Sequence, residues 1–101
     1  MPTQLTGKQR RHLRGLAHHL KPVVHVGNNG ISDALVDKVD AELIAHELIK
    51  VKVGENGPED IKAAGAELAK RLEAHLAQTI GRVIVLYREH DKEPEIRLPK
   101  P

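Results

Sequence analysis

The spacing of apolar residues along the chain predicts an alternation of helices and strands. Apolar residues recur at every third or fourth position, the spacing of an amphipathic helix, over residues 7–19, 32–45 and 58–76. Short β-branched or alternating runs predict strands at residues 22–26, 48–53, 82–88 and 95–98. The predicted order of elements is therefore α-β-α-β-α-β-β.

Residue types that favour helix starts support these boundaries. Thr6 and Gln9 have the spacing of a capping box at the start of the first helix. Ser32 is a good N-cap for the second helix, and Pro58 suits the first position of the third. Thr6 and Ser32 can thus accept a hydrogen bond from a free N–H group at the helix start, and Pro58 has no N–H group that would need an acceptor.

The order of elements predicts an α/β fold of two layers with a mixed four-stranded sheet. Strands that are joined through a helix take a right-handed crossover and run parallel. The last two predicted strands are joined by a short polar turn, so the fourth strand runs antiparallel. Strand 82–88 is the most apolar and is expected in the centre of the sheet, whereas strand 95–98 is flanked by prolines and is expected at an edge.

Length and composition are those of one small domain with an aliphatic core. The chain has 101 residues, no Cys, no Phe or Trp, and one Tyr. We assign residues 1–98 to a single domain and expect residues 99–101 to form a loose tail. No apolar run approaches the roughly 18 residues of a membrane span, and no apolar segment follows the basic start as in a signal peptide. These features favour a cytoplasmic location.

Charge is distributed unevenly along the chain. Residues 1–32 contain five basic residues and no Asp or Glu, whereas the remaining residues hold 11 basic and 14 acidic side chains. The modest net charge of +2 therefore conceals a basic N-terminal third. Such a segment is expected to bind a polyanion, of which nucleic acid is the commonest. The five basic residues are Lys8, Arg10, Arg11, Arg14 and Lys21.

Two G-x-x-G tetrapeptides each follow a predicted strand and precede a predicted helix. In the first, Gly27–Gly30, the glycines permit a tight turn and close approach, and the helix N-terminus that follows favours phosphate. In the second, Gly54–Gly57, Glu55 and the acidic residues after the loop would repel phosphate. We therefore interpret the first loop, with Asn28 and Asn29 at its tip, as a phosphate contact and the second as a plain turn.

Three further polar residues lie on predicted strands. Lys50 and Lys52 share one face of strand 48–53, where they either extend the basic surface or protect an edge strand from unwanted pairing. His25 alternates with Val24 and Val26, which predicts that it lies on the opposite face of its strand. The pattern assigns His25 no role.

The sequence gives no indication of a metal site or a catalytic centre. The seven His residues lack metal-binding spacing and there is no Cys, so we expect neither a metal nor a cofactor. Ser32 is the only Ser and is explained as a helix cap. Asp and Glu are plentiful, but nothing singles out a catalytic pair. The chain is therefore not expected to be an enzyme.

The near absence of aromatic residues predicts how RNA would be bound. A platform that stacks single-stranded bases needs several aromatic side chains, and this chain has only Tyr87. Contact with phosphates and 2′-hydroxyls of folded RNA is the expected mode. Sequence specificity should then be modest, and affinity should depend strongly on salt.

Five segments are distinctive in combination: Gly15-Leu16-Ala17-His18, Leu20-Lys21-Pro22-Val23-Val24, Gly27-x-x-Gly30, His46-Glu47-Leu48-Ile49-Lys50-Val51-Lys52 and Val85-Leu86-Tyr87-Arg88. In this order and spacing they resemble the YhbY proteins, the bacterial stand-alone members of the CRM (chloroplast RNA splicing and ribosome maturation) domain family. The resemblance covers nearly the whole chain.

The resemblance implies an RNA-binding domain similar to the C-terminal domain of bacterial translation initiation factor three. It also implies a link to precursors of the large ribosomal subunit. Relatives often carry Lys or Arg inside the first loop, whereas this chain has Asn28 and Asn29. A loop contact here would therefore rest on backbone N–H groups and side-chain amides. The residues expected to contact RNA are Lys8, Arg10, Arg11, Arg14, Lys21, Gly27, Asn28, Asn29, Gly30, Ser32, Lys50, Lys52 and Arg88.

The sequence and the resemblance together predict a non-enzymatic protein that binds structured ribosomal RNA and assists large-subunit assembly. The alternative is a protein-interaction module that docks on a ribosomal protein or an assembly factor through the acidic faces of the second and third helices. Copurification with and without ribonuclease distinguishes these hypotheses. Neither a membrane nor a small-molecule substrate is expected as a partner.

Overall fold

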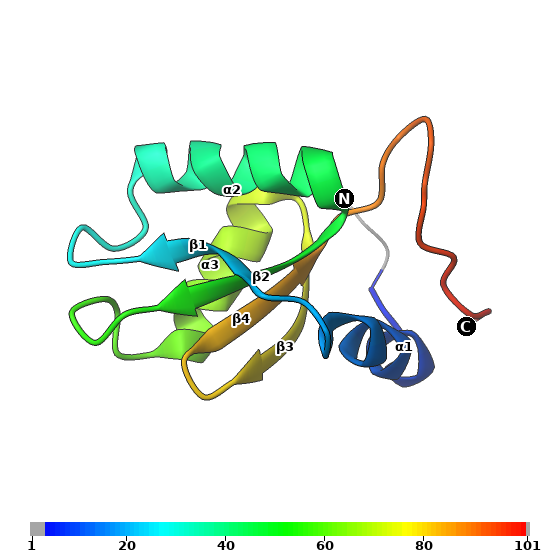
Figure 1. The fold of residues 1–101 in the computed structure, drawn as a ribbon, viewed down its shortest axis with the longest axis horizontal. Helices are drawn as coiled ribbons and strands as arrows, with labels where there is room; N and C mark the ends of the chain where they lie inside the picture. Colours follow the sequence, from blue (N-terminus) through cyan, green and yellow to red (C-terminus); the bar gives the residue numbers. More distant parts are fainter. Residues whose placement is uncertain (1–3, 101) are drawn as a thin grey trace.

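A computed structural model describes residues 4–100 of the chain. Its elements in order are α1 (Gly7–Ala17), β1 (Pro22–Val26), α2 (Asp33–His46), β2 (Leu48–Val53), α3 (Ile61–Leu72), β3 (His75–Ile80) and β4 (Val83–Tyr87) (Figure 1). The predicted order α-β-α-β-α-β-β is confirmed. The capping box of α1 is also present, because Thr6 and Gln9 exchange side chain–backbone hydrogen bonds of 3.0 and 3.1 Å.

The sheet is mixed and has the strand order β1-β2-β4-β3. Strands β1 and β2 are parallel, whereas β4 runs antiparallel to both of its neighbours. The most apolar strand is therefore central, as its sequence predicts. The α/β fold with a mixed four-stranded sheet is confirmed, but strand 82–88, expected to run parallel to strand 48–53, runs antiparallel to it because β3 intervenes between α3 and β4.

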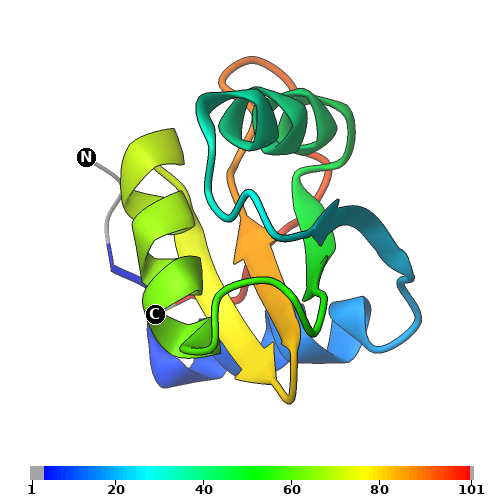
Figure 2. The same ribbon diagram turned by 90° about the vertical axis from the view of Figure 1, so that its left-hand side faces the viewer.

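Helices cover both faces of the sheet (Figures 1 and 2). Helices α2 and α3 pack on one face, where they bury the alternate strand residues Val24, Val26, Ile49, Val51 and Leu86 in the main core. Helix α1 packs on the other face, where it forms a smaller core with Leu48, Val85 and Tyr87. It lies under the end of the sheet away from the two loops that follow β1 and β2, so the other half of that face is uncovered (Figure 1).

Helix α3 begins later than its sequence predicts. We expected a helix over residues 58–76 with Pro58 at its first position, but the helix starts at Ile61. Asp60 is its N-cap, and the Asp60 carboxylate accepts a hydrogen bond of 2.9 Å from the backbone N–H of Ala63. An Asp that satisfies a free N–H group defines the start better than a Pro that merely tolerates the position.

Helix α3 also ends four residues early. Glu73 adopts a left-handed backbone conformation with φ of 51°, and the N–H of Ala74 donates to the carbonyl of Ala69 at 2.9 Å. This is the hydrogen bond that closes a Schellman-type helix end, here without a glycine. Leu76 continues the four-residue apolar spacing, but it lies on β3 and packs against the main core from there.

The predicted strand at residues 95–98 is wrong, and the strand that completes the sheet, β3, precedes β4. The two strands are joined through Gly81, which has φ of 55°, and Arg82. Ile96 does pack against the smaller core, so the alternation predicted its partial burial correctly. The backbone N–H groups of Glu95 and Ile96, however, donate to the carboxylate of Glu47 and to no strand.

Candidate nucleic-acid interface

The first loop, Gly27–Gly30, joins the end of β1 to α2. The N–H of Gly30 donates to the carbonyl of Gly27 at 3.0 Å, and Gly30 has φ of 62°, a conformation that favours glycine. Asn28 and Asn29 lie exposed at the tip. Within residues 4–100 no hydrogen bond engages their side-chain amides. The tip therefore presents polar groups to solvent.

Gly27 has no structural reason to be glycine. It does not adopt a positive φ, and a Cβ atom added there would meet nothing within 4 Å. The fold would thus accept a side chain at this position. A glycine here leaves the backbone open to close approach by an external molecule.

The second loop, Gly54–Gly57, lies beside the base of the first. The N–H of Gly54 donates to the carbonyl of Val26, the residue before the first loop, at 2.8 Å. A Cβ atom on Gly57 would lie 2.9 Å from the Val53 side chain and 3.0 Å from the Val26 carbonyl. Arg82 also donates to the carbonyls of Val53 and Gly54. Internal packing therefore explains the second loop, in agreement with its interpretation as a turn.

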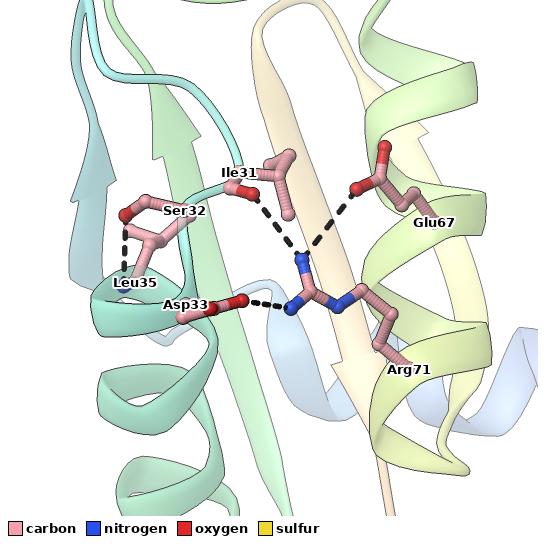
Figure 3. Close-up of polar contacts among 6 residues, drawn as sticks. All are labelled: Ile31, Ser32, Asp33, Leu35, Glu67 and Arg71. Carbon is pink, nitrogen blue, oxygen red and sulfur yellow. Dashed lines mark hydrogen bonds and ion pairs between the residues drawn. The ribbon is translucent and has the colours of Figure 1, made fainter.

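The N-terminus of α2 follows the first loop directly. Ser32 is its N-cap, as predicted, and the Ser32 hydroxyl accepts a hydrogen bond of 3.2 Å from the N–H of Leu35 (Figure 3). The N–H groups of Asp33 and Ala34 find no acceptor in the described part of the chain. Together with the helix dipole, these groups favour an anion at this end.

Arg71 of α3 holds this helix end in place (Figure 3). Its guanidinium lies 2.6 Å from the carboxylate of Asp33, donates to the carbonyl of Ile31 at 3.2 Å, and lies 3.7 Å from Glu67. The exit of the first loop is thus tied to α3, and the negative charge of Asp33 is compensated. The sequence gives no local signal for this contact, because the two paired residues are 38 positions apart.

The five basic residues of the N-terminal third are all exposed. None of the ion pairs among residues 4–100 involves Lys8, Arg10, Arg11, Arg14 or Lys21. By contrast, Arg71, Arg82 and Arg88 are all bound to acceptors elsewhere in the fold. The basic side chains on and after α1 are therefore available to an external anion.

Lys50 and Lys52 extend this basic region across the uncovered half of the sheet. Strand β2 lies between β1 and β4, so the alternative that these lysines protect an edge strand is wrong. Lys52 is exposed and is the cross-strand neighbour of His25, which is exposed as well. The prediction that His25 lies opposite the buried Val24 and Val26 is confirmed.

Arg88 is not brought together with the other predicted residues. Its guanidinium lies 2.8 Å from the carboxylate of Asp40 and donates to the carbonyl of Leu72 at 3.0 Å. Only 22% of the side chain is exposed. An RNA contact by Arg88 stays a prediction. Its bonds to Asp40 and to the Leu72 carbonyl link β4 to α2 and α3.

Two hollows on the surface differ in charge. A hollow of about 340 Å³ lies beside the end of α1 and is lined by Arg14, Gly15, His18, Lys50, Gln78 and Ile80. A larger hollow of about 1280 Å³ lies near the C-terminal segment, and its acidic lining residues are Glu73, Glu89, Asp91 and Glu93. Only the smaller hollow suits an anionic ligand.

Glu47 organises the C-terminal segment. It is fully buried and adopts φ of 59°, and its carboxylate accepts hydrogen bonds from the backbone N–H groups of His90, Glu95 and Ile96 at 2.8, 2.7 and 2.9 Å. Burial would raise the pKa of Glu47, but these three bonds and the nearby His90 ring together lower it below its ordinary value. The carboxylate therefore stays charged in the interior.

Tyr87 and His75 lie together on the α1 face of the sheet, with ring centroids 6.0 Å apart. Burial, with the charges of Glu89 and Glu47, raises the pKa of Tyr87 to about 12. Burial and the charge of Arg10 lower the pKa of His75. Both groups are thus held in their neutral forms, which suits a packed pair.

Residues 4–100 contain no group of three or more His, Asp and Glu residues that could hold a metal ion. None of the described helices has both the length and the apolar character of a membrane span.

Comparison with known proteins adds a family context. Residues 5–88 match the CRS1 / YhbY (CRM) domain. The chain is 45% identical over 95 residues to a Bacillus subtilis protein named probable RNA-binding protein YqeI, covering 94% of this chain and 99% of that protein. It is 41% identical over 98 residues to a Haemophilus influenzae RNA-binding protein, covering 97% and 98%. The solution structure of the Staphylococcus aureus protein SAV1595, proposed to bind RNA, has a TM-score of 0.82 at 42% identity, covering 95% of this chain and 100% of that one.

Proposed function

The chain belongs to the CRS1/YhbY (CRM) domain family and is an RNA-binding protein, and we propose that it contacts structured RNA through its first G-x-x-G loop and a basic surface. The basic surface consists of residues of α1, the segment after it and β2, all exposed except the half-buried Lys50: Lys8, Arg10, Arg11, Arg14, Lys21, Lys50 and Lys52.

The observation that carries the proposal is the unneeded glycine at position 27. The fold leaves space for a side chain there, yet the residue is glycine. A phosphate that is bound by the N–H groups of the loop and of the α2 N-terminus would come too close for a Cβ atom. Asn28 and Asn29 add amide donors in place of the charged residues that relatives often carry.

The electrostatics support the same surface. Its basic side chains lack acidic partners within residues 4–100, so binding RNA breaks no internal ion pair among them. Each phosphate that they neutralise releases counterions, which makes the affinity salt-dependent.

Folded RNA is the substrate that this surface suits. The only aromatic side chain of the Phe, Trp and Tyr types, Tyr87, is 2% exposed and offers no stacking platform. Without base stacking, the protein can still contact RNA through phosphates and 2′-hydroxyls, and folded RNA presents both in a fixed geometry. In line with the family resemblance, we take ribosomal RNA in precursors of the large subunit as the target, bound in the cytoplasm to assist assembly without catalysis.

A filter-binding titration tests the basic surface. The triple change Arg10→Gln, Arg11→Gln and Arg14→Gln should weaken binding to folded ribosomal RNA fragments and leave the fold intact. The slope of log affinity against log salt should flatten by roughly 0.7 to 0.9 for each lost phosphate contact.

A matched control removes the same charge elsewhere. Lys62, Lys70 and Lys92 are exposed on α3 and the C-terminal segment, so their triple change to Gln should leave the salt slope nearly unchanged. Equal effects of the two triple variants would mean that only net charge matters and would overturn the proposal.

The larger, acid-lined hollow supports a second candidate function, docking of a basic protein partner. Its acidic residues lie on or after α3 and β4, and the basic surface lies mainly on α1 and β2. If a ribosomal protein copurifies with the chain after ribonuclease treatment, docking is favoured. If the association is lost, RNA mediates it.

A further inference from the structure

The smaller hollow, of about 340 Å³, lies between side chains of β2 and β3 and the end of α1. Lys50 of β2 and Gln78 of β3 are both register partners of Val85 on the central strand β4. Val85 itself is fully buried, and the hollow is lined by the two polar side chains on either side of it. The end of α1, with Arg14, Gly15 and His18, closes one side. The hollow is therefore built by two strands and the end of a helix, and it does not depend on a loop.

Gly15 is the unusual residue of this wall. It lies inside α1, where glycine is about 1 kcal/mol less favourable than alanine. Its φ is not positive, and the helix is capped by His18, so Gly15 does not serve to end the helix. A Cβ atom there would meet nothing within 4 Å. As at Gly27, the fold gives no reason for the missing side chain.

The chemistry of the walls matches the parts of a nucleotide. Arg14 and Lys50 supply positive charge for a phosphate, and the Gln78 amide can both donate to and accept from a base edge. Ile80, which is 52% exposed, and the bare backbone at Gly15 offer apolar contact to a base face. The Arg14 guanidinium can also stack on a base.

We propose that this hollow holds one unstacked nucleotide of the bound RNA, with its phosphate toward Arg14 and Lys50 and its base toward Gln78. The inference rests on the proposed function and adds a base-dependent contact to it. A volume of about 340 Å³ is at the lower end of small-molecule sites, roughly 300–1,000 Å³, and suits one nucleotide rather than a run of them. Folded RNA offers such nucleotides in bulges and loops.

The site also accounts for the shortage of aromatic residues. A single extruded base can be held by an amide, an aliphatic side chain and a guanidinium without an aromatic platform. The rest of the interface then reads only phosphates and shape. The protein would prefer folded RNA that carries one extruded base and would show little other sequence preference.

The test compares RNA hairpins that differ at one position. One set carries a single bulged nucleotide, A, C, G or U, and the reference hairpin carries an abasic residue at the bulge. The wild-type protein should bind at least one bulged hairpin about tenfold more tightly than the abasic one, the effect of a few direct contacts. No difference among the five hairpins would overturn the inference.

Variants then locate the effect. Gly15→Leu fills the hollow, and Gln78→Leu removes the amide, so both should reduce binding of the preferred hairpin to the abasic level and leave abasic binding within about twofold. Gly15→Ala should raise the thermal midpoint, because alanine favours the helix, while it lowers the bulge preference. Ala66→Leu, an exposed change on α3, is the control and should alter neither quantity.

The failure of this inference and that of the proposed function are distinguishable. If the wild-type protein binds all hairpins with steep salt dependence but equally, the basic surface stands and the nucleotide site is wrong. If Gly15→Leu keeps the bulge preference, the base is read elsewhere and the site is also wrong. If no hairpin binds in a salt-dependent way, both the proposed function and the inference that rests on it are wrong.

Discussion

The two G-x-x-G loops lie side by side at one end of the sheet, each between a strand and a helix (Figures 1 and 2). Their glycines nevertheless differ in what the fold requires of them. A side chain on Gly57 would collide with Val53 and with the Val26 carbonyl, whereas a side chain on Gly27 would meet nothing. The second loop thus needs glycine for packing inside the molecule. The first needs it only if something outside the molecule comes close.

The helix ends beyond the loops share the same capping pattern but differ in charge. After the second loop, Asp60 caps α3 and satisfies the N–H of Ala63. After the first loop, the neutral hydroxyl of Ser32 caps α2, and the negative charge of Asp33 is compensated by Arg71. A shared tetrapeptide therefore says little about binding, and the surroundings of each glycine decide its role.

The largest expected difference comes from adding one negative charge at the tip of each loop in turn. Asn29→Glu should weaken RNA binding by about 30- to 150-fold, or about 2–3 kcal/mol, because a like charge beside phosphate is strongly unfavourable. The thermal midpoint should barely move, since the tip is exposed. Asn56→Glu adds the same charge to the second loop and should leave RNA binding nearly intact.

Filter binding measures the RNA affinity of the two variants, and thermal melts measure their midpoints. Equal losses in both variants would show that only net charge matters. A greater loss for Asn56→Glu would mean that the second loop is the contact.

A smaller effect is expected from adding a methyl group to each loop. Gly57→Ala should lower the free energy of unfolding by about 1–2 kcal/mol, because the new Cβ is forced against Val53 and the Val26 carbonyl. Gly27→Ala should leave stability unchanged or raise it by up to about 1 kcal/mol.

RNA binding should respond in the opposite order, with a loss for Gly27→Ala and little change for folded Gly57→Ala. Urea unfolding and RNA titration of both variants measure the two quantities. If Gly27→Ala keeps full affinity, the close approach of RNA to that backbone is refuted.

The smallest effect is expected from neutralising one carboxylate beside each loop. Asp33→Asn removes a negative charge from the α2 N-terminus and should strengthen RNA binding about two- to threefold, since such charges at helix ends are worth roughly 0.3–1 kcal/mol. Asp60→Asn at α3 should change neither affinity nor stability, because Asn caps a helix as well as Asp does.

Competition binding against wild-type protein resolves differences of this size. Stronger binding by both variants, or by Asp60→Asn alone, would contradict the assignment of the phosphate contact to the first loop.

The sequence predicts the first half of this fold well because local signals define it. Thr6 with Gln9 and Ser32 mark helix starts, and alternation marks β1 and β2. The prediction fails after Leu72 because Glu73 ends α3 in a left-handed conformation without a glycine, and Leu76 happens to continue the helical spacing. The two-residue turn at Gly81 and Arg82 was the available signal for the β3–β4 hairpin.

The candidate site is predictable where it is local in sequence. The first loop and the basic residues of α1 are contiguous segments, so charge and spacing reveal them. Other features depend on residues that are far apart in the chain. These are the central position of β2, the ion pair of Arg71 with Asp33 and the hollow that both Lys50 and Gln78 line. Only the tertiary structure brings these together.

The contacts of Glu47 show that the folding unit extends beyond the part of the chain that matches the family model. The family match ends at residue 88, but the carboxylate of Glu47 takes its donors from His90, Glu95 and Ile96. A chain cut after residue 88 would lose every one of these donors together with the segment that packs on the carboxylate, which should destabilise the fold. We infer that the folding unit reaches at least to Ile96. The match to the family model is therefore shorter than the folding unit, whose end is set by Glu47 in the middle of the chain.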